Sequence, residues 1–344
     1  MRAASLKLVS IAAVLAVLLP AAPAAARLRA PDWAKPAVRY LVNQGWIDKT
    51  QFRGDAPMAR RDFKRLMQAA FGGGYRRTRG KVTAGEVSAA LVSVLGRSDL
   101  AARLTTVTSP DGWAPGVGVR FGTEVVAREL GLRHDRPTDQ EGLEASASEP
   151  LPQADVAWAV WKAATSPATY SADTLNGFSL PDLGRKQRKV VKFAMSLTGT
   201  PYIWGGDWPA RTPAGYPFGS QPSGGFDCSG FLWYVLQAKT SSYSPIDRPY
   251  KGWSLPERSS ADMAKATPRK QRLGFRKLRA GDIVLFAPGG RSRARARDVY
   301  HAGLYLGRGW MIHSSGSRAG ISLADISPGT WWHGEIMWGR RVIS

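Results

Sequence analysis

The sequence contains a single cysteine, Cys228, so it cannot form an internal disulfide bond. Its four histidines do not combine with cysteines or carboxylates at metal-ligand spacing, and we therefore expect no bound metal. It also lacks a phosphate-binding glycine loop, so no nucleotide cofactor is expected. These absences exclude a disulfide framework and predict a protein that works without metal or cofactor.

Long hydrophobic runs are also scarce. The apolar stretch of residues 8–19 is too short to cross a bilayer comfortably. Arg2 and Lys7 form a short basic start before this stretch, and small residues at 24–26 follow it as a cleavage site. This is the pattern of a cleaved secretory signal. We expect residues 1–26 to be a signal peptide, the mature protein to be secreted, and no stable membrane anchor to remain.

Acidic residues are few beside basic ones. The chain has 48 Lys and Arg against 26 Asp and Glu, which gives a net charge of +22. Residues 185–344 hold most of the basic excess, with 25 basic and 9 acidic side chains. A basic surface favours an anionic partner, and an export signal argues against nucleic acid. Anionic wall polymers or lipid head groups fit this charge, and plain solubility is the alternative explanation.

The region after the signal is predicted to be helical. Apolar residues recur at helical spacing between glycine-containing loops, and the segments "PMARRDFKRLM" and "LPQADVAWAVW" are similar enough to indicate weak internal repetition. The expected helices lie within residues 32–71, as a pair, and at 82–95, 121–130 and 154–164.

This region resembles S-layer homology repeats. The match is best over residues 31–72, through Trp33, Ala37, Leu41, Gly45, Phe52, Pro57, Arg60 and Phe63. The resemblance implies a wall-binding module over residues 27–165. The family usually has threonine before the arginine at the start of the second helix, where this chain has Ala59, and a plain helical domain is the alternative. The polar stretch 166–184 is predicted to be a linker, and residues 185–344 a second domain that starts with an amphipathic helix.

Cys228 lies where a glycine-rich loop meets an apolar segment, in "GGFDCSGFLWYVL". A thiol in the first turn of a helix meets unpaired backbone N–H groups and the positive end of the helix dipole, which favour the reactive thiolate. Asp227 is suited to cap that helix, and the N–H of Cys228 is free to bind a developing oxyanion. The alternative is a structural cysteine on a buried helix.

Two histidines are predicted to share one face of a hairpin. "VYHAGLYLG" alternates like a strand, Gly-Arg-Gly follows as a turn, and "WMIH" returns. If the hairpin is centred on Arg308, His313 lies opposite Gly303 and His301 is its diagonal neighbour, although a slip of one residue would separate them. His301 would then serve as the base for a cysteine nucleophile, with His313 to orient it. The other histidines, at 134 and 333, are expected on the surface.

The segments "PYIWGG", "FDCSGF", "GDIVLF" and "HAGLYLG…IH" resemble, in order, the NlpC/P60 family of papain-like cysteine peptidases. The resemblance covers about residues 186–344. It implies an α+β fold in which the cysteine helix packs on an antiparallel sheet that carries both histidines.

The same resemblance implies a role for each matching residue. Cys228 matches the nucleophile, His301 the base and His313 the third member of the triad. Tyr202 matches a tyrosine near the active site, and Asp227 and Ser229 match positions that in some members contact the amine end of a peptidoglycan stem peptide. Members mostly cleave the bond between D-γ-glutamate and a diamino acid, so the expected protein is a cell-wall endopeptidase.

This chain departs from the family in two places. The segment between Gly206 and Asp227 is longer than usual, and so is the interval from Cys228 to His301, which includes the run "RSRARAR" at residues 291–297. Both changes affect the expected cleft, so the bond cleaved stays open. The arginine run is explained by a solvated loop or by contact with a wall polymer. An amidase or acyltransferase on the same fold, and a non-catalytic wall-binding protein, are the alternative functions.

Overall fold

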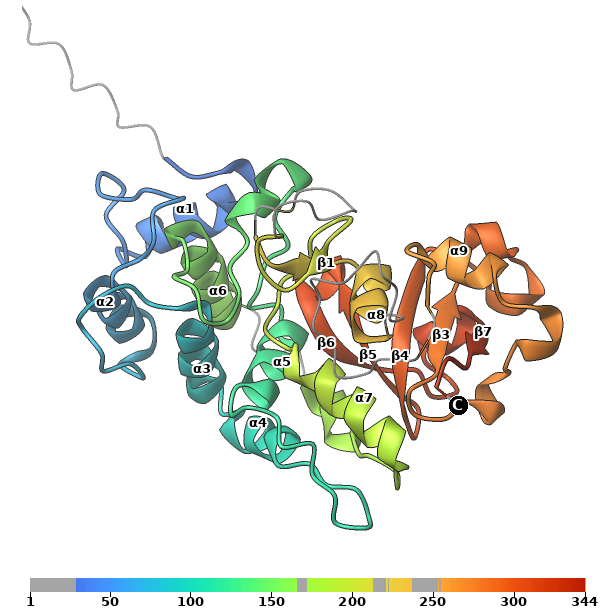
Figure 1. The fold of residues 1–344 in the computed structure, drawn as a ribbon. Helices are drawn as coiled ribbons and strands as arrows, with labels where there is room; N and C mark the ends of the chain where they lie inside the picture. Colours follow the sequence, from blue (N-terminus) through green and yellow to red (C-terminus); the bar gives the residue numbers. More distant parts are fainter. Residues whose placement is uncertain are drawn as a thin grey trace, which may run out of the picture.

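The computed structural model describes residues 29–165, 172–212, 221, 223–236, 253 and 255–343. The predicted signal peptide, residues 1–26, lies outside these described residues. A helical region comes first and an antiparallel sheet with its own helices follows, so the fold is α+β, as predicted (Figure 1). Within the described part of the chain, no helix has the length and apolar character needed to span a membrane.

The helical region has one more helix than the sequence predicted. The helices are α1 (Lys35–Asn43), α2 (Arg60–Phe71), α3 (Ala84–Val94), α4 (Ser98–Thr105), α5 (Phe121–Glu129) and α6 (Gln153–Thr165). The unforeseen one, α4, is eight residues long and buries Leu100, Ala101 and Leu104. It is too short for its apolar spacing to stand out in a window of the length used to read helices.

Three backbone hydrogen bonds form a closed cycle where α2, α3 and α6 begin. The amide of Met58 donates to the carbonyl of Leu151 at 3.0 Å, and the amide of Leu151 donates to Val82 at 2.9 Å. The amide of Val82 completes the cycle by donating to Met58 at 3.0 Å. The two similar sequence segments and a third one, around Val82, therefore meet at one centre.

The C-terminal part is built on a five-stranded antiparallel sheet in the order β6-β5-β4-β3-β7. The strands are β3 (Ile283–Phe286), β4 (His301–Gly307), β5 (Trp310–Ser315), β6 (Gly320–Asp325) and β7 (Ile336–Arg340). A separate pair is formed by β1 (Asp207–Trp208) and β2 (Gly225–Phe226). The accompanying helices are α7 (Arg185–Ser196), α8 (Cys228–Leu236), α9 (Ser260–Lys265) and α10 (Trp331–Gly334). Helix α8 is apolar on nearly every side and packs on β4 and β5 (Figure 1).

Part of the predicted linker is packed rather than solvated. Residues 166–171 lie outside the described residues, but a 3-10 helix, Ala172–Gly177, follows them. Leu175 and Leu180 are buried, and the Phe178 ring meets the edge of Trp310 at 5.4 Å between centroids. The apolar residues between the polar ones therefore anchor residues 172–183 to the sheet. The domain boundaries themselves stay a prediction.

The helical region and the sheet share one apolar core, which extends from Ala34 to Ile343. Arg128 of α5 is fully buried at their junction and donates to the carbonyls of Ala319, Arg318 (3.2 Å) and Thr200 (3.4 Å). Burial lowers the pKa of Arg128 to about 10. These contacts join α5 to the segments on either side of the candidate site.

Candidate active site

The β4–β5 hairpin has the register that its sequence predicted. Leu304 pairs with Ile312 and Tyr305 with Met311, so the hairpin is centred on Arg308. Arg308 adopts φ 52°, the left-handed conformation of a tight turn, between two glycines. The predicted alignment of the two histidines is therefore the one that the strands adopt.

His301 and His313 meet directly. The Nε2 atom of His301 lies 2.7 Å from Nδ1 of His313, and the ring planes are 86° apart. Both residues are buried. A Cβ at Gly303 would lie 2.6 Å from Sδ of Met311 and 3.4 Å from Cβ of His313. Glycine is thus needed between the histidines, although the space beside it is filled mainly by Met311 and not by the imidazoles alone.

Trp332, which the sequence did not indicate, packs against both histidines. Its ring lies 5.0 Å from that of His301 and 5.3 Å from that of His313, between centroids. Phe286 covers His301 from another side at 6.0 Å. Burial lowers the pKa of His301 to about 3 and holds the pKa of His313 well below its usual value. Both imidazoles are therefore neutral near pH 7.

Cys228 is the first residue of α8 and is 8% exposed. Burial raises the pKa of its thiol to about 12, and the negative charge of Asp227 acts in the same direction. Hydrogen bonds from the backbone amides of Ala302 and Ser229 favour the thiolate. Because Ala302 follows His301 in β4, the thiol lies close to His301, the predicted base. The thiolate stabilisation expected from the helix start is outweighed by desolvation.

Asp227 caps α8, as the sequence predicted. Its Oδ1 atom accepts hydrogen bonds from the amide of Gly230 at 2.6 Å and from the hydroxyl of Ser229 at 2.9 Å. Arg258, which no motif in the sequence indicated, donates to the same carboxylate at 3.1 Å and to Asp207 at 2.9 Å. The loop before the cysteine is therefore held by an internal ion-pair network.

Tyr202 lies beside this loop and forms an isolated parallel β-bridge with Phe226. Burial raises the pKa of Tyr202, and the charges of Cys228 and Asp227 add to the effect. Asp135 of the helical region comes close as well, because a Cβ at Gly316 would lie 2.7 Å from its carboxylate and 3.6 Å from the Tyr202 ring. Burial, followed by the charge of Glu141, raises the pKa of Asp135 to about 7. The helical region thus contributes carboxyl groups near the tyrosine.

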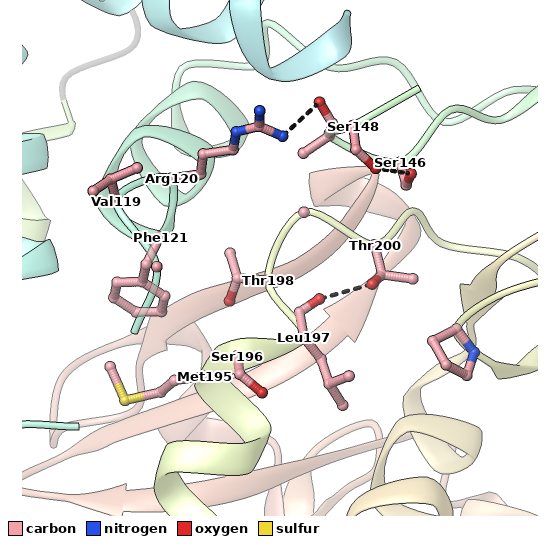
Figure 2. Close-up of a pocket in the computed structure, with 14 residues that line it drawn as sticks. Val119, Arg120, Phe121, Ser146, Ser148, Met195, Ser196, Leu197, Thr198 and Thr200 are labelled. Atoms are coloured by element: carbon pink, nitrogen blue, oxygen red, sulfur yellow. Dashed lines mark hydrogen bonds between the residues drawn. The ribbon is translucent and has the colours of Figure 1, made fainter. Parts of the chain in front are cut away.

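Two cavities near the site are not lined by Cys228. One of about 530 Å³ lies between α5, residues 146–148 and the loop after α7. Figure 2 shows the Arg120 guanidinium reaching across it towards the loop of Ser146 and Ser148, opposite Thr198. A second cavity, of about 350 Å³, includes His313 with Trp331 and Trp332 in its lining. Among the residues that the structure describes, no three His, Cys, Asp or Glu side chains form a metal-binding group.

The two remaining histidines are not the surface residues that the sequence predicted. His134 is sandwiched between Trp33 and Trp158, with ring centroids 4.3 and 4.2 Å away, and burial lowers its pKa to about 4. The ring of His333 is half-buried, and its Nδ1 atom lies 3.0 Å from the carbonyl oxygen of Ile326. Aromatic residues distant in sequence create the first environment, so local sequence could not reveal it.

The arginine run at 291–297 lies on the surface. It spans two short 3-10 turns, Gly290–Ser292 and Ala296–Asp298, and its four arginines are exposed. Arg297 makes a long contact of 3.8 Å with Asp298. The run is therefore solvated in this structure.

The NlpC/P60 family matches residues 199–340. The chain is 32% identical over 152 residues to the bifunctional muramidase/DL-endopeptidase CwlT of Bacillus subtilis, a stretch that covers 44% of this chain and 35% of that protein. It is 28% identical over 155 residues to the gamma-D-glutamyl-L-lysine dipeptidyl-peptidase of the same organism, covering 45% of this chain and 40% of the relative.

A solved structure of an NlpC/P60 family protein from Bacillus cereus is also similar, with 23% identity and a TM-score of 0.33. The similarity covers 48% of this chain and 42% of that one. The chain thus matches well under half of the length of each of these proteins.

Proposed function

We propose that the protein, whose residues 199–340 match the NlpC/P60 family, is a cysteine peptidase that hydrolyses stem-peptide bonds of peptidoglycan. Cys228 is the nucleophile, His301 the base and His313 the residue that orients the base. The observation that carries the proposal is the 2.7 Å contact between His301 and His313 on the strand that packs against the cysteine helix.

The contact between the two histidines indicates the role of each ring nitrogen of His301. Nε2 of His301 is engaged by His313, which leaves Nδ1 as the atom available to the thiol. For Nδ1 to accept a proton, the hydrogen of neutral His301 must be on Nε2 and be donated to Nδ1 of His313. His313 therefore fixes both the ring plane and the tautomer of the base.

The raised pKa of Cys228 and the lowered pKa of His301 favour a neutral resting pair. In the proposed reaction, Nδ1 of His301 takes the thiol proton as Sγ attacks the scissile carbonyl carbon. The resulting oxyanion accepts a hydrogen bond from the amide of Cys228. The C–N bond then breaks, and the departing amine takes the proton from His301, leaving a thioester on Cys228.

Water completes the cycle. His301 removes a proton from the attacking water, the tetrahedral intermediate collapses, and the thiolate leaves and regains its proton from His301. The products are a carboxylic acid and a free amine. This balance needs no metal or redox partner, in keeping with the absence of a metal motif from the sequence.

We propose the bond between D-γ-glutamate and a diamino acid as the one cleaved, as the names of the Bacillus subtilis relatives suggest. Tyr202, Asp227 and Ser229 lie next to the thiol and are proposed to hold the amine end of the stem peptide. Asp227 already bonds Arg258, but a carboxylate has acceptor positions for further donors. The helical region is proposed to hold anionic wall polymers in the secreted protein, as its resemblance to S-layer homology repeats implies.

The test is to incubate the purified protein and a Cys228→Ala variant with peptidoglycan and to identify the soluble products by mass spectrometry. New D-glutamate and diamino-acid termini from the wild type alone support the proposal. Products ending in a transferred acyl group, formed when an amine acceptor is added, would instead identify an acyltransferase. Release of whole stem peptides would identify an amidase, and binding to the wall without products would overturn catalysis altogether.

A further inference from the structure

Two buried polar atoms beside the histidine pair have no hydrogen-bond partner in the described part of the chain. One is Nε2 of His313, and the other is the hydroxyl oxygen of Ser322. His313 is 1% exposed and Ser322 is fully buried. A buried polar atom without a partner costs about 1–3 kcal/mol, so a hydrogen bond between the two, made by a rotation of either side chain, would remove both penalties.

The strand register makes them direct neighbours. His313 of β5 is paired with Ser322 of β6, so the two side chains project from the same face of the sheet. Cβ atoms of residues paired in this way are about 4.5–5.5 Å apart. A serine hydroxyl reaches its three staggered positions by rotation about a single bond, which brings it within reach of an imidazole nitrogen.

The chemistry of the triad requires an acceptor at this position. If His301 donates from Nε2, Nδ1 of His313 is an acceptor and the hydrogen of neutral His313 must be on Nε2. An acceptor at Nε2 stabilises this tautomer. Without one, the alternative tautomer gains ground, in which His313 donates to His301 and the proton of His301 moves to Nδ1, where it blocks the base.

We propose that Ser322 is a positioning residue for the triad: its hydroxyl oxygen accepts the Nε2–H of His313 and so sets the tautomer of both histidines. The proposal rests on the proposed catalytic function. The series of contacts then runs from Cys228 through His301 and His313 to Ser322. The last two residues belong to the adjacent strands β5 and β6.

The surroundings favour Ser322 over a charged partner. Arg318 is the charged residue whose field acts on His313, and it lowers the histidine's pKa. Arg318 is itself paired with Glu129 at 3.0 Å. Trp332 packs on the rings of both histidines and offers the pair no charged group. A neutral hydroxyl serves as an acceptor here without adding a buried charge.

The first test compares kinetics of Ser322→Ala and Ser322→Thr with those of the wild type on a soluble stem peptide. Ser322→Ala is expected to lower kcat by about 10- to 100-fold, the range typical of a metal-bound histidine that loses the partner of its second ring nitrogen. KM should change little, because Ser322 does not touch the substrate. Ser322→Thr keeps the hydroxyl and should restore most of kcat.

Ser88→Ala is the matched control. Ser88 is a buried serine of α3 whose hydroxyl also has no partner among the described residues, and it lies in the helical region. Its loss should leave kcat unchanged. Equal losses of activity in the alanine variants at 88 and 322 would overturn the proposal, since buried serines would then act through stability alone.

The second test does not depend on catalysis. In the Cys228→Ala background, nitrogen NMR of the histidine rings is expected to show His313 protonated at Nε2, and Ser322→Ala should move it towards the Nδ1 tautomer. An unchanged tautomer in Ser322→Ala overturns the proposal even if the enzyme is active. A shifted tautomer, together with a wild-type protein that cleaves no peptidoglycan, would support the contact and refute the catalytic function instead.

Discussion

Arg258 joins Asp227, the residue before Cys228, to Asp207 at the start of β1. The guanidinium also donates to the hydroxyl of Ser229 at 3.0 Å and to the carbonyl of Gly205 at 2.7 Å. One side chain thus holds both flanks of the cysteine and the turn that precedes β1. A planar fork of five donors can serve all these acceptors, whereas an ammonium group cannot.

Replacing Arg258 with lysine is therefore expected to reduce both stability and activity. Loss of hydrogen bonds to a charged group costs about 1.5–3 kcal/mol, which urea denaturation will measure. The rate kcat should also fall, because Asp227 and Ser229 lose their fixed positions. Arg269→Lys, at an exposed position, is the control and should change neither quantity. A fully active Arg258→Lys enzyme would show that the network is not needed.

The shielding of His301 by Trp332 predicts the pH dependence of activity. The acid side of the profile of kcat/KM reports the pKa of the base in the free enzyme. Burial lowers that pKa to about 3, so activity should persist well below the usual histidine range. Trp332→Ala admits water to the ring, raises the pKa towards 6.5 and shifts the acid limb to higher pH. Trp331→Ala removes a neighbouring, 65% exposed ring and should leave the limb in place.

His134 predicts a pH dependence of stability. Its pKa is about 4 in the folded protein and near 6.5 when unfolded, so the unfolded state binds the proton more readily. The contribution of neutral His134 to the free energy of unfolding is complete above pH 6.5 and is lost as the pH falls towards 4. His134→Phe keeps an aromatic ring between Trp33 and Trp158 and cannot bind a proton. The variant should lose less stability than the wild type over that interval, as measured by urea midpoints; parallel losses would contradict the assignment.

Several features of the site could be predicted from sequence because their causes are local. Alternating apolar residues and the Gly-Arg-Gly turn determine the hairpin, and the hairpin determines the meeting of His301 and His313. The cap by Asp227 likewise depends on residues next to it in the chain. Arg258 and Trp332 could not be found in this way, because each reaches the site by packing of segments far from it in sequence.

The same distinction explains the errors in the helical region. A polar composition predicted a linker, but Leu175 and Leu180 occur among the polar residues and are buried. His134 looked like a surface residue because Trp33 and Trp158, which enclose it, are distant in sequence. Burial that arises between segments leaves little signal in either segment alone.

Arg128 predicts that the helical region and the sheet unfold together. It is fully buried, and its guanidinium lies 3.6 Å from the equally buried carboxylate of Glu124. Arg128→Met would leave Glu124 without its partner and break the contacts to Ala319 and Thr200. Removing one partner of a buried ion pair costs about 3–5 kcal/mol, and thermal unfolding should remain a single transition at lower temperature. The double variant with Glu124→Gln should recover part of the loss.

Separate melting of the two parts in the wild type would contradict this prediction. Far-UV circular dichroism, to which α1–α6 contribute most of the helical signal, can follow the helical region, while loss of peptidase activity follows the proposed triad. The two signals should change at the same temperature.

The continuous core also has a mechanical consequence. A domain on a flexible tether searches a volume, but the helical region is bonded to the sheet through Arg128 and lies in the same packed interior. The position of the Cys228 thiol relative to α1–α6 is therefore set by the fold. A surface bound by the helical region would therefore meet the thiol at one fixed distance and one fixed angle.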